Sequence, residues 1–287
     1  MKISSTDLIL NPDGSIYHLS LRPEHLADTI ITVGDPDRVA KVSQYFDFIE
    51  FKINKREFVT HTGTLGGKRL TVISSGIGTD NVEILMNELD ALVNIDLETL
   101  EEKSTHKSLN IIRLGTSGSL QNYIPVDSVL VSEKAIGLDA LGFFYNHTPH
   151  PLNATIKKDL DLKFKPYSCY SSKRLLRIFL KDAPQNWYKG TTVTCPGFYA
   201  PQGRTLRYEQ MNQGLLERMN RFYRNGTHLT NLEMETAGYY LFGQILGHEV
   251  LSISAILANR MANEFSQHPE KQIDSLIKFA LEKISLI

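Results

Sequence analysis

Apolar residues along the chain follow two alternating patterns: short β-branched runs, and longer stretches with an apolar residue every three or four positions. Residues 29–33 (TIITV) form a run of the first kind and lead into Gly-Asp-Pro at 34–36, which predicts a buried strand that ends in a turn. Pro36 suits a first helical position. Val39, Val42 and Phe46 then line one face of the helix that we expect to follow.

The same two patterns recur to the end of the chain. Residues 58–65 and 70–74 flank Gly66-Gly67, which predicts a β-hairpin. Further strands are predicted at 109–114, ending in a small-residue turn at 115–118, and at 129–132, 191–194 and 250–258. Amphipathic helices are predicted from the apolar positions within 82–93, 235–246 and 273–284. We expect an exposed loop at 101–107, and 137–190 shows no clear pattern.

Strands that alternate with helices predict an α/β fold with a largely parallel sheet. No linker-like stretch and no repeat of 20–50 residues interrupts the pattern. We therefore predict one domain over residues 1–287.

Composition excludes several classes of protein. The 287 residues are 41% apolar and carry 31 basic against 32 acidic side chains, a net charge of −1. Nucleic-acid and membrane-surface proteins usually show a basic excess, so neither partner is expected. Cys169 and Cys195 are the two cysteines and form no C-x-x-C pair, so neither a disulfide framework nor structural zinc is expected. No apolar run suits a signal peptide or a membrane span, so we predict a cytoplasmic protein.

Several common catalytic motifs are incomplete. Gly76-Ile77-Gly78 lacks the third glycine of a dinucleotide fingerprint, and 115–119 lacks the last glycine of a G-x-S-x-G elbow. His248-Glu249 is followed by no second histidine, and no phosphate loop of the G-x-x-x-x-G-K type occurs. These absences argue against a dehydrogenase, a serine hydrolase, a metalloprotease and a nucleoside triphosphatase.

Polar residues at four predicted strand ends remain, where ligands bind in α/β proteins. Gly34 and Arg38 suit an oxyanion, or else form a turn with a solvated arginine. Arg113 and Thr116 suit a buried anion, or a structural ion pair. Arg56 is an anion ligand or a surface charge. A carboxylate at Glu233 or Glu235 suits a sugar diol, or caps the following helix.

Together these residues resemble the nucleoside phosphorylase family, and within it the uridine phosphorylases. The resemblance rests on motifs that recur in order: Tyr17-His18-Leu19, Gly34-Asp35-Pro36-Asp37-Arg38, Arg56-Glu57-Phe58, Ser75-Gly76-Ile77-Gly78, Arg113-Leu114-Gly115-Thr116-Ser117-Gly118, Phe198-Tyr199 with Gln202-Gly203-Arg204, Glu233-Met234-Glu235 and Asn259-Arg260. It covers about 16–135 and 191–262.

The resemblance implies a three-layer α/β/α fold with a central mixed sheet. It also implies reversible phosphorolysis of a pyrimidine nucleoside to free base and α-ribose-1-phosphate, as in pyrimidine salvage and nucleoside catabolism. Inorganic phosphate is then the co-substrate, and no cofactor is required. The sequence leaves uridine, thymidine, deoxyuridine and modified pyrimidine nucleosides open as substrates.

The resemblance also assigns roles to particular residues. It places phosphate at Gly34, Arg38, Arg56, Arg113 and Thr116; ribose at His18, Glu233, Met234 and Glu235; and the base at Phe198, Gln202, Arg204 and Arg260. Gln202 and Arg204 would stabilise the leaving base. We expect their side chains to point the same way from an extended loop.

In this family Arg56 and His18 would serve a neighbouring subunit, so a homo-oligomer, dimer or hexamer, with shared sites is expected. Bacterial relatives hold a monovalent cation between subunits, and the corresponding positions for potassium are Glu57, Ile77 and Asn81. The small G-P-S of those relatives is Thr79-Asp80-Asn81 here.

Three alternatives remain open. A purine nucleoside phosphorylase would carry an aspartate where Ala258-Asn259-Arg260 stands. A nucleosidase of the same fold would use water and would not need three arginines around an anion. A nucleoside-binding protein without catalysis could dispense with Arg38 and Arg113.

Overall fold

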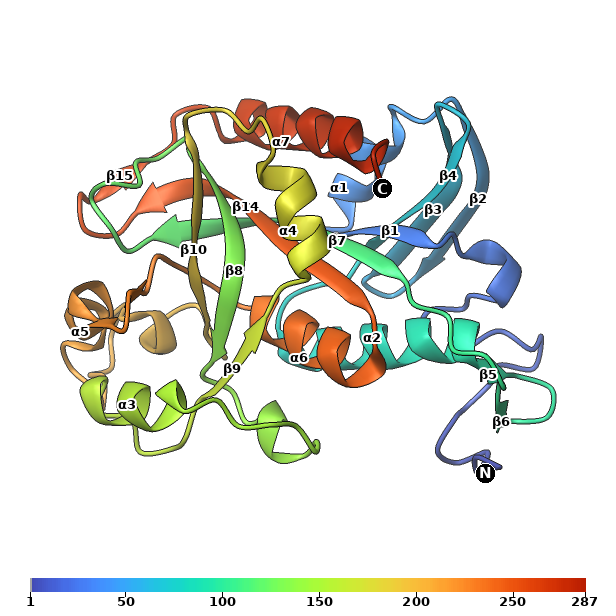
Figure 1. The fold of residues 1–287 in the computed structure, drawn as a ribbon, viewed down its shortest axis with the longest axis horizontal. Coiled ribbons are helices and arrows are strands. Elements are labelled where there is room, and N and C mark those ends of the chain that lie inside the picture. Colours follow the sequence, from blue (N-terminus) through green and yellow to red (C-terminus); the bar gives the residue numbers. More distant parts are fainter. Residues whose placement is uncertain (1) are drawn as a thin grey trace.

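The computed structural model describes residues 2–287, and Figure 1 shows a central sheet with helices on both faces. The main strands are β1 (Thr29–Val33), β2 (Phe48–Lys55), β3 (Phe58–Leu65), β4 (Lys68–Ser74), β7 (Asn110–Ser119), β8 (Val129–Gly137), β9 (Tyr167–Tyr170), β10 (Trp187–Thr194), β13 (Asn231–Glu233), β14 (Glu249–Asn259) and β15 (Glu264–Phe265). The helices are α1 (Asp37–Ser43), α2 (Thr79–Asn94), α3 (Leu152–Asp159), α4 (Lys173–Leu180), α5 (Leu215–Arg221), α6 (Thr236–Leu246) and α7 (Pro269–Ile284).

Both faces of the sheet are buried, which creates three layers. Ile30 of β1 belongs to an apolar cluster with α2 and α6, whereas its neighbour Ile31 belongs to a second cluster with α1, α4 and α7. Successive side chains of a strand point to opposite faces, so the β-branched run 29–33 contributes apolar side chains to both clusters. The predicted α/β/α architecture is confirmed.

The sheet is mixed, and part of it closes on itself. β1 lies parallel to both β4 and β7. On the far side of β4, β3 pairs antiparallel with β4, and β2 pairs antiparallel with β3. Beyond β7 the strands form a circuit, β7–β14–β8–β10–β13 and back to β7, which combines parallel and antiparallel pairings. This closed half of the sheet occupies the left of Figure 1.

Several predicted elements are confirmed. β1 spans 29–33, and α2 and α7 follow the predicted apolar stripes. β3 and β4 pair across Gly66 and Gly67, whose φ angles of 57° and 77° explain why glycine occupies both turn positions.

The turn predicted at 115–118 is wrong, because β7 runs straight through it. Strand β1 ends at Val33, but on the same edge of β7 Gly118 and Ser119 then pair with β13. Strand β14 pairs with β7 along its other edge. The backbone of β7 therefore continues to form hydrogen bonds with neighbouring strands, and its small side chains do not require a turn.

Other differences arise where the polarity pattern is weak. β8 and β10 extend well beyond 129–132 and 191–194, and 137–190 contains α3, β9 and α4. The predicted loop at 101–107 is exposed, but Glu101–Glu102 (β6) pairs with Ile95–Asp96 (β5). β2 was not predicted, because this half-exposed strand carries no apolar run.

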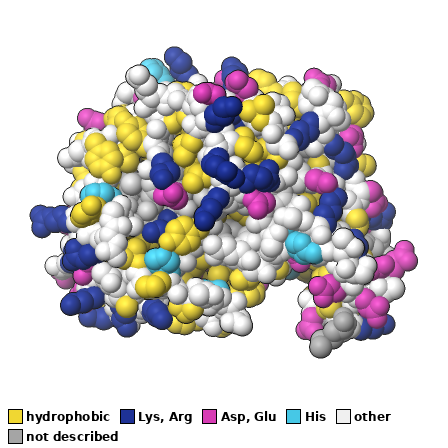
Figure 2. Space-filling model, in the orientation of Figure 1, with side chains coloured by type: hydrophobic (Ala, Val, Ile, Leu, Met, Phe, Trp, Pro, Cys, Tyr) yellow, Lys and Arg dark blue, Asp and Glu magenta, His cyan; other side chains and the backbone are white. Residues whose placement is uncertain are grey.

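The surface agrees with the balanced composition. On the face shown in Figure 2, Lys and Arg side chains are interspersed with Asp and Glu. Within residues 2–287, no helix combines the length and apolarity needed to cross a bilayer.

Candidate active site

One pocket of about 770 Å³ brings together most of the residues singled out in the sequence. Its wall comes from the turns after β1 and β4, the middle of β7, the β13–α6 junction and the loop after β10. Of the predicted ligand residues, it is lined by Gly34, Arg38, Arg113, Thr116, Phe198, Gln202, Arg204, Glu233, Met234 and Glu235. Its volume falls in the range typical of small-molecule sites, roughly 300–1,000 Å³.

Gly34, Arg38 and Thr116 form one side of this pocket. The Arg38 guanidinium is half-buried and donates from Nη1 to the Leu114 carbonyl at 3.3 Å. Burial lowers the pKa of Arg38, yet an arginine remains protonated at neutral pH. This side of the pocket therefore presents a cation, most of whose N–H donors remain available to a ligand.

Arg113 lies deeper and is almost fully buried. Its Nη2 forms ion pairs with Glu235 and, at 3.2 Å, with Glu233, and Nη1 donates to Ser252 Oγ at 3.3 Å. Burial opposes the guanidinium charge, but the two carboxylates outweigh it and raise the pKa of Arg113. Arg113 Nε has no hydrogen-bond partner within residues 2–287. The structural ion pair considered for Arg113 is thus present.

Glu233 and Glu235 differ in what their carboxylates contact. Glu233 accepts bonds from the backbone N–H groups of Glu235 and Thr236 at 3.0 and 2.9 Å and from Thr194 Oγ1 at 2.5 Å, so it caps the start of α6. Glu235 accepts the Gly78 N–H at 2.9 Å besides the Arg113 pair. Burial raises the pKa of Glu235, while the Arg113 charge acts in the opposite direction.

The loop after β10 holds the predicted base ligands. Residues Ala200–Gln202 form a 3-10 turn and Gly203 has φ 70°, so the extended loop expected here is wrong. The side chains nevertheless meet, because Arg204 Nη1 donates to Gln202 Oε1 at 2.7 Å. The Arg204 guanidinium also lies over the Phe198 ring, 3.7 Å from its centre.

Arg260 borders this loop without lining the pocket; its Nη1 donates to the Gln202 carbonyl at 2.9 Å. His18 and Arg56 also lie outside the pocket wall. His18 Nδ1 bonds Glu88 Oε1 at 2.6 Å. The Tyr17 ring lies close to both His18 and Arg56, 4.8 Å from the His18 ring and 6.0 Å from the Arg56 guanidinium. His18 and Arg56 thus occupy one surface region, apart from the other predicted ribose and phosphate ligands.

Glu57, Ile77 and Asn81, the predicted potassium ligands, all line the pocket. They crowd Gly76, where a Cβ would lie 2.6 Å from Asn81 Nδ2 and 3.0 Å from Glu57 Cγ. Asn81 Nδ2 donates to the Ile77 carbonyl at 3.3 Å. That carbonyl already accepts one hydrogen bond, so the Glu57 carboxylate and Asn81 Oδ1 are the oxygens of this set that a cation could take most readily. Potassium here stays a prediction.

Sequence reasoning missed some residues of the site. Phe265 lines the pocket from β15, a two-residue strand paired with the end of β14. Thr194 and Ser252 hold Glu233 and Arg113 from neighbouring strands. No local pattern marks these residues, because their role depends on strand register.

The α/β fold and this pocket, lined by arginines, buried glutamates and an aromatic loop, are typical of α/β proteins that bind a small anionic or polar ligand. Within that class, the chain belongs to the phosphorylase superfamily, whose sequence model matches residues 28–284.

Individual relatives agree with this membership. The chain is 28% identical over 277 residues to a uridine phosphorylase of Thermococcus kodakarensis, covering 94% of this chain and 87% of the relative. It is 23% identical over 274 residues to a DeoD-type purine nucleoside phosphorylase of Bacillus velezensis, covering 93% and 99%.

A solved structure of a Trypanosoma brucei nucleoside phosphorylase, described as showing uridine phosphorylase activity, superposes with a TM-score of 0.88 at 28% identity, covering 98% of this chain and 100% of that one. A Toxoplasma gondii purine nucleoside phosphorylase shares the fold, with a TM-score of 0.70 at 19% identity and coverage of 96% and 97%.

Proposed function

We propose that this protein is a uridine phosphorylase, a pentosyltransferase that converts uridine and inorganic phosphate to uracil and α-ribose-1-phosphate. One observation carries the proposal: a single pocket is lined by Gly34, Arg38 and Thr116, by Glu235, and by Phe198, Gln202 and Arg204. These three sets suit phosphate, sugar and base. The named uridine phosphorylases among the relatives support the same reaction.

Phosphate binds at the Gly34 side. Arg38 and Arg113 supply guanidinium donors for the dianion, with the Thr116 hydroxyl and the Gly34 N–H beside them. Arg113 is held by Glu233 and Glu235, so it directs its remaining N–H groups with little freedom to rotate. Positioning of the nucleophile supplies several kcal/mol of the barrier.

The sugar lies over the β13–α6 junction. Glu235, fixed by the Gly78 N–H and Arg113, has lone pairs left to accept the ribose hydroxyls, and Met234 packs against the ring. Glu233 keeps Glu235 and Arg113 in place through the cap of α6.

Phosphorolysis proceeds as a phosphate oxygen forms a bond to the anomeric carbon while the glycosidic C–N bond breaks. The bonding electrons leave with the base, whose developing negative charge is met by the Gln202 amide and the Arg204 guanidinium. A well-placed donor of this kind is worth about 10²–10³ in rate. No step is routed through a metal ion.

Each site is completed by a second copy of the chain. His18 and Arg56 lie together outside the pocket wall, where a neighbouring subunit would receive them. The assembly is then at least a dimer. Both cysteines are free and buried, which suits the cytoplasm.

The decisive experiment follows the products of uridine with and without phosphate, with cytidine and inosine in parallel. We expect uracil and ribose-1-phosphate to form only with phosphate. Cytidine should be inert, because its exocyclic amine would face the Arg204 donor; such mispairing costs about 10⁴ in kcat/KM.

Other outcomes identify other functions. Release of free ribose at the same rate without phosphate would indicate a nucleosidase, and binding without turnover a nucleoside-binding protein. Inosine as the best substrate would indicate a purine nucleoside phosphorylase and overturn the assignment of Gln202 and Arg204 to uracil.

A further inference from the structure

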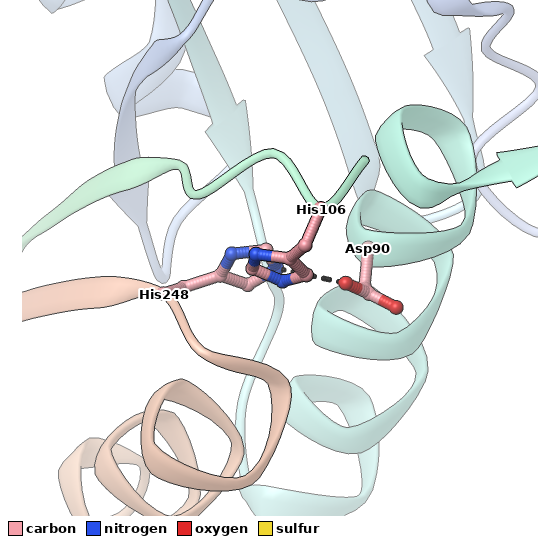
Figure 3. Close-up of side chains that lie close together, drawn as sticks. All are labelled: Asp90, His106 and His248. Carbon is pink, nitrogen blue, oxygen red and sulfur yellow. Dashed lines mark ion pairs between the residues drawn. The ribbon is translucent and has the colours of Figure 1, made fainter. Parts of the chain in front are cut away.

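Three metal-ligating side chains come together away from the pocket: Asp90 on α2, His106 in the segment before β7, and His248 immediately before β14 (Figure 3). One potential ligand atom from each lies within 4.8 Å of the other two. Sequence reasoning rejected His248 as part of a zinc motif because no second histidine follows it. The fold supplies that histidine from a distant segment.

Among the described residues 2–287, no group forms a hydrogen bond with the buried Nε2 of His248. Its side chain is 0% exposed, and Nδ1 accepts the Leu109 N–H at 3.2 Å. Nε2 has no hydrogen-bond partner within residues 2–287 and lies 3.2 Å from Asp90 Oδ1. Buried polar atoms nearly always have a hydrogen-bond partner; the contact of this nitrogen with Asp90 lacks hydrogen-bond geometry, so both atoms can take a shared ligand.

Hydrogen bonds hold the other two side chains next to His248. His106 Nε2 bonds the Leu246 carbonyl at 2.9 Å, which leaves Nδ1 free, and Asn94 Nδ2 donates to Asp90 Oδ1 at 2.6 Å. Hydrogen bonds that hold the ligand side chains in this way are typical of metal sites. Gly247 has φ 73°, and a Cβ there would lie 3.0 Å from His106 Cε1, so glycine permits the close approach.

We propose that Asp90, His106 and His248 bind a divalent transition-metal ion of the Zn²⁺ class, with water as the fourth ligand. Ligand bonds of about 2.0–2.1 Å in a tetrahedron place neighbouring ligand atoms about 3.4 Å apart, close to the 3.2 Å between His248 and Asp90. Two imidazoles favour such an ion over Mg²⁺ or Ca²⁺, which prefer oxygen.

Two rearrangements accompany binding. The His248 ring carries its single proton on Nδ1, so the Leu109 amide gives up its 3.2 Å bond. The exposed His106 side chain turns its Nδ1 toward the ion. Both changes involve the segment that leads into β7.

The role of this site is structural. α2 begins beside Gly78, whose N–H holds Glu235, and α6 begins directly after Glu235. Asp90 lies near the other end of α2, and His248 follows the other end of α6. The ion therefore joins the far ends of the two helices whose first turns support the pocket, and it stabilises the fold without entering the reaction.

Zn²⁺ itself is the probe. Full-length protein freed of metal by a chelator is titrated with Zn²⁺ by calorimetry, and its thermal unfolding is followed with and without the ion. We expect one Zn²⁺ per chain and a higher unfolding midpoint. Asp90→Asn and His106→Gln should each weaken Zn²⁺ binding at least ~10-fold and abolish the midpoint shift. His268→Gln, at an exposed histidine outside the cluster, should behave as wild type.

Co²⁺ supplies a second readout, because a tetrahedral site gives intense visible absorption that His106→Gln should remove. Circular dichroism of the metal-free variants shows whether each is folded. Absence of stoichiometric Zn²⁺ binding overturns the proposal. Equal affinity in wild type, Asp90→Asn and His106→Gln also overturns it, since it indicates scattered surface histidines. Phosphorolysis is assayed alongside but does not decide the question.

Discussion

Arg113 shows how much one side chain in this protein depends on others. Its guanidinium is buried between Glu233 and Glu235 and reaches Ser252. Removal of one partner from a buried pair costs about 3–5 kcal/mol of folding free energy. Arg113 variants would therefore confound stability with phosphate binding, and the half-buried Arg38 is the better residue for a functional test.

We predict that Arg38→Ala raises the KM for phosphate at least ~10-fold, because a hydrogen bond to a charged group contributes about 1.5–3 kcal/mol. The KM for uridine should change much less. Initial rates at varied phosphate measure this, with Arg177→Ala, an exposed arginine of α4, as the control. Unchanged phosphate dependence in Arg38→Ala would contradict the assignment.

The two glutamates of the β13–α6 junction should separate binding from stability. Glu235→Gln is expected to weaken nucleoside binding by about 30-fold, because it removes a charge-assisted bond to the sugar, and also to lower stability, because Arg113 loses a charged partner; Glu233→Gln should leave nucleoside affinity nearly unchanged. Glu233→Gln is expected chiefly to lower the unfolding free energy, since its carboxylate caps α6 through several N–H and O–H donors. Calorimetric nucleoside titration and thermal unfolding distinguish the two. Equal nucleoside affinity in wild type and Glu235→Gln would make Glu235 a structural residue only.

At the scale of elements, strand β7 can line the pocket because it has a glycine, Gly115, where the Arg113 side chain folds back over the strand. A Cβ on Gly115 would lie 2.0 Å from Arg113 Nη1 and 2.7 Å from Cζ. Gly115 is not at a positive φ, so the strand itself tolerates alanine. Glycine is needed here for space.

Gly115→Ala should consequently displace the Arg113 guanidinium. We expect a loss of about 1–3 kcal/mol of stability from overpacking and a phosphate KM raised ~10-fold or more. Gly118→Ala on the same strand is the matched control, because its Cβ would meet Arg260 Cγ at an ordinary 3.5 Å. Similar unfolding midpoints for the two variants would argue against displacement of Arg113.

Helices and strands with a strong pattern of hydrophobic positions could be predicted from the sequence. Elements whose extent depends on pairing with distant strands could not. The uninterrupted apolar run of β1 and the stripe of α2 are local properties of the sequence. The continuation of β7 past Leu114 depends on β13 and β14, which are distant in the chain. The motifs marked most of the pocket wall, yet Phe265 and the bond between Gln202 and Arg204 depend on tertiary structure.

At the scale of the whole molecule, the placement of His18 and Arg56 outside the pocket wall makes the assembly testable. Arg56→Ala and Arg38→Ala chains, each weakly active alone when phosphate is limiting, should regain activity when mixed through unfolding and refolding. In a dimer, half of the molecules are mixed and each has one intact site, so about one quarter of wild-type activity is expected. Mixed oligomers verified by mass spectrometry that show no recovery would rule out shared sites.

The closed circuit of strands also has a consequence for synthesis of the chain. Arg113 and the Ser252 that it contacts are 139 residues apart, and Glu235 is 122 residues from Arg113. A ribosome adding about 5–20 residues per second needs on the order of ten seconds to cover such a distance. Until Glu233 and Glu235 have been added, the nascent β7 has neither β13 nor β14 beside it, and Arg113 has no carboxylate partner. The pocket therefore assembles only as the last strand leaves the ribosome.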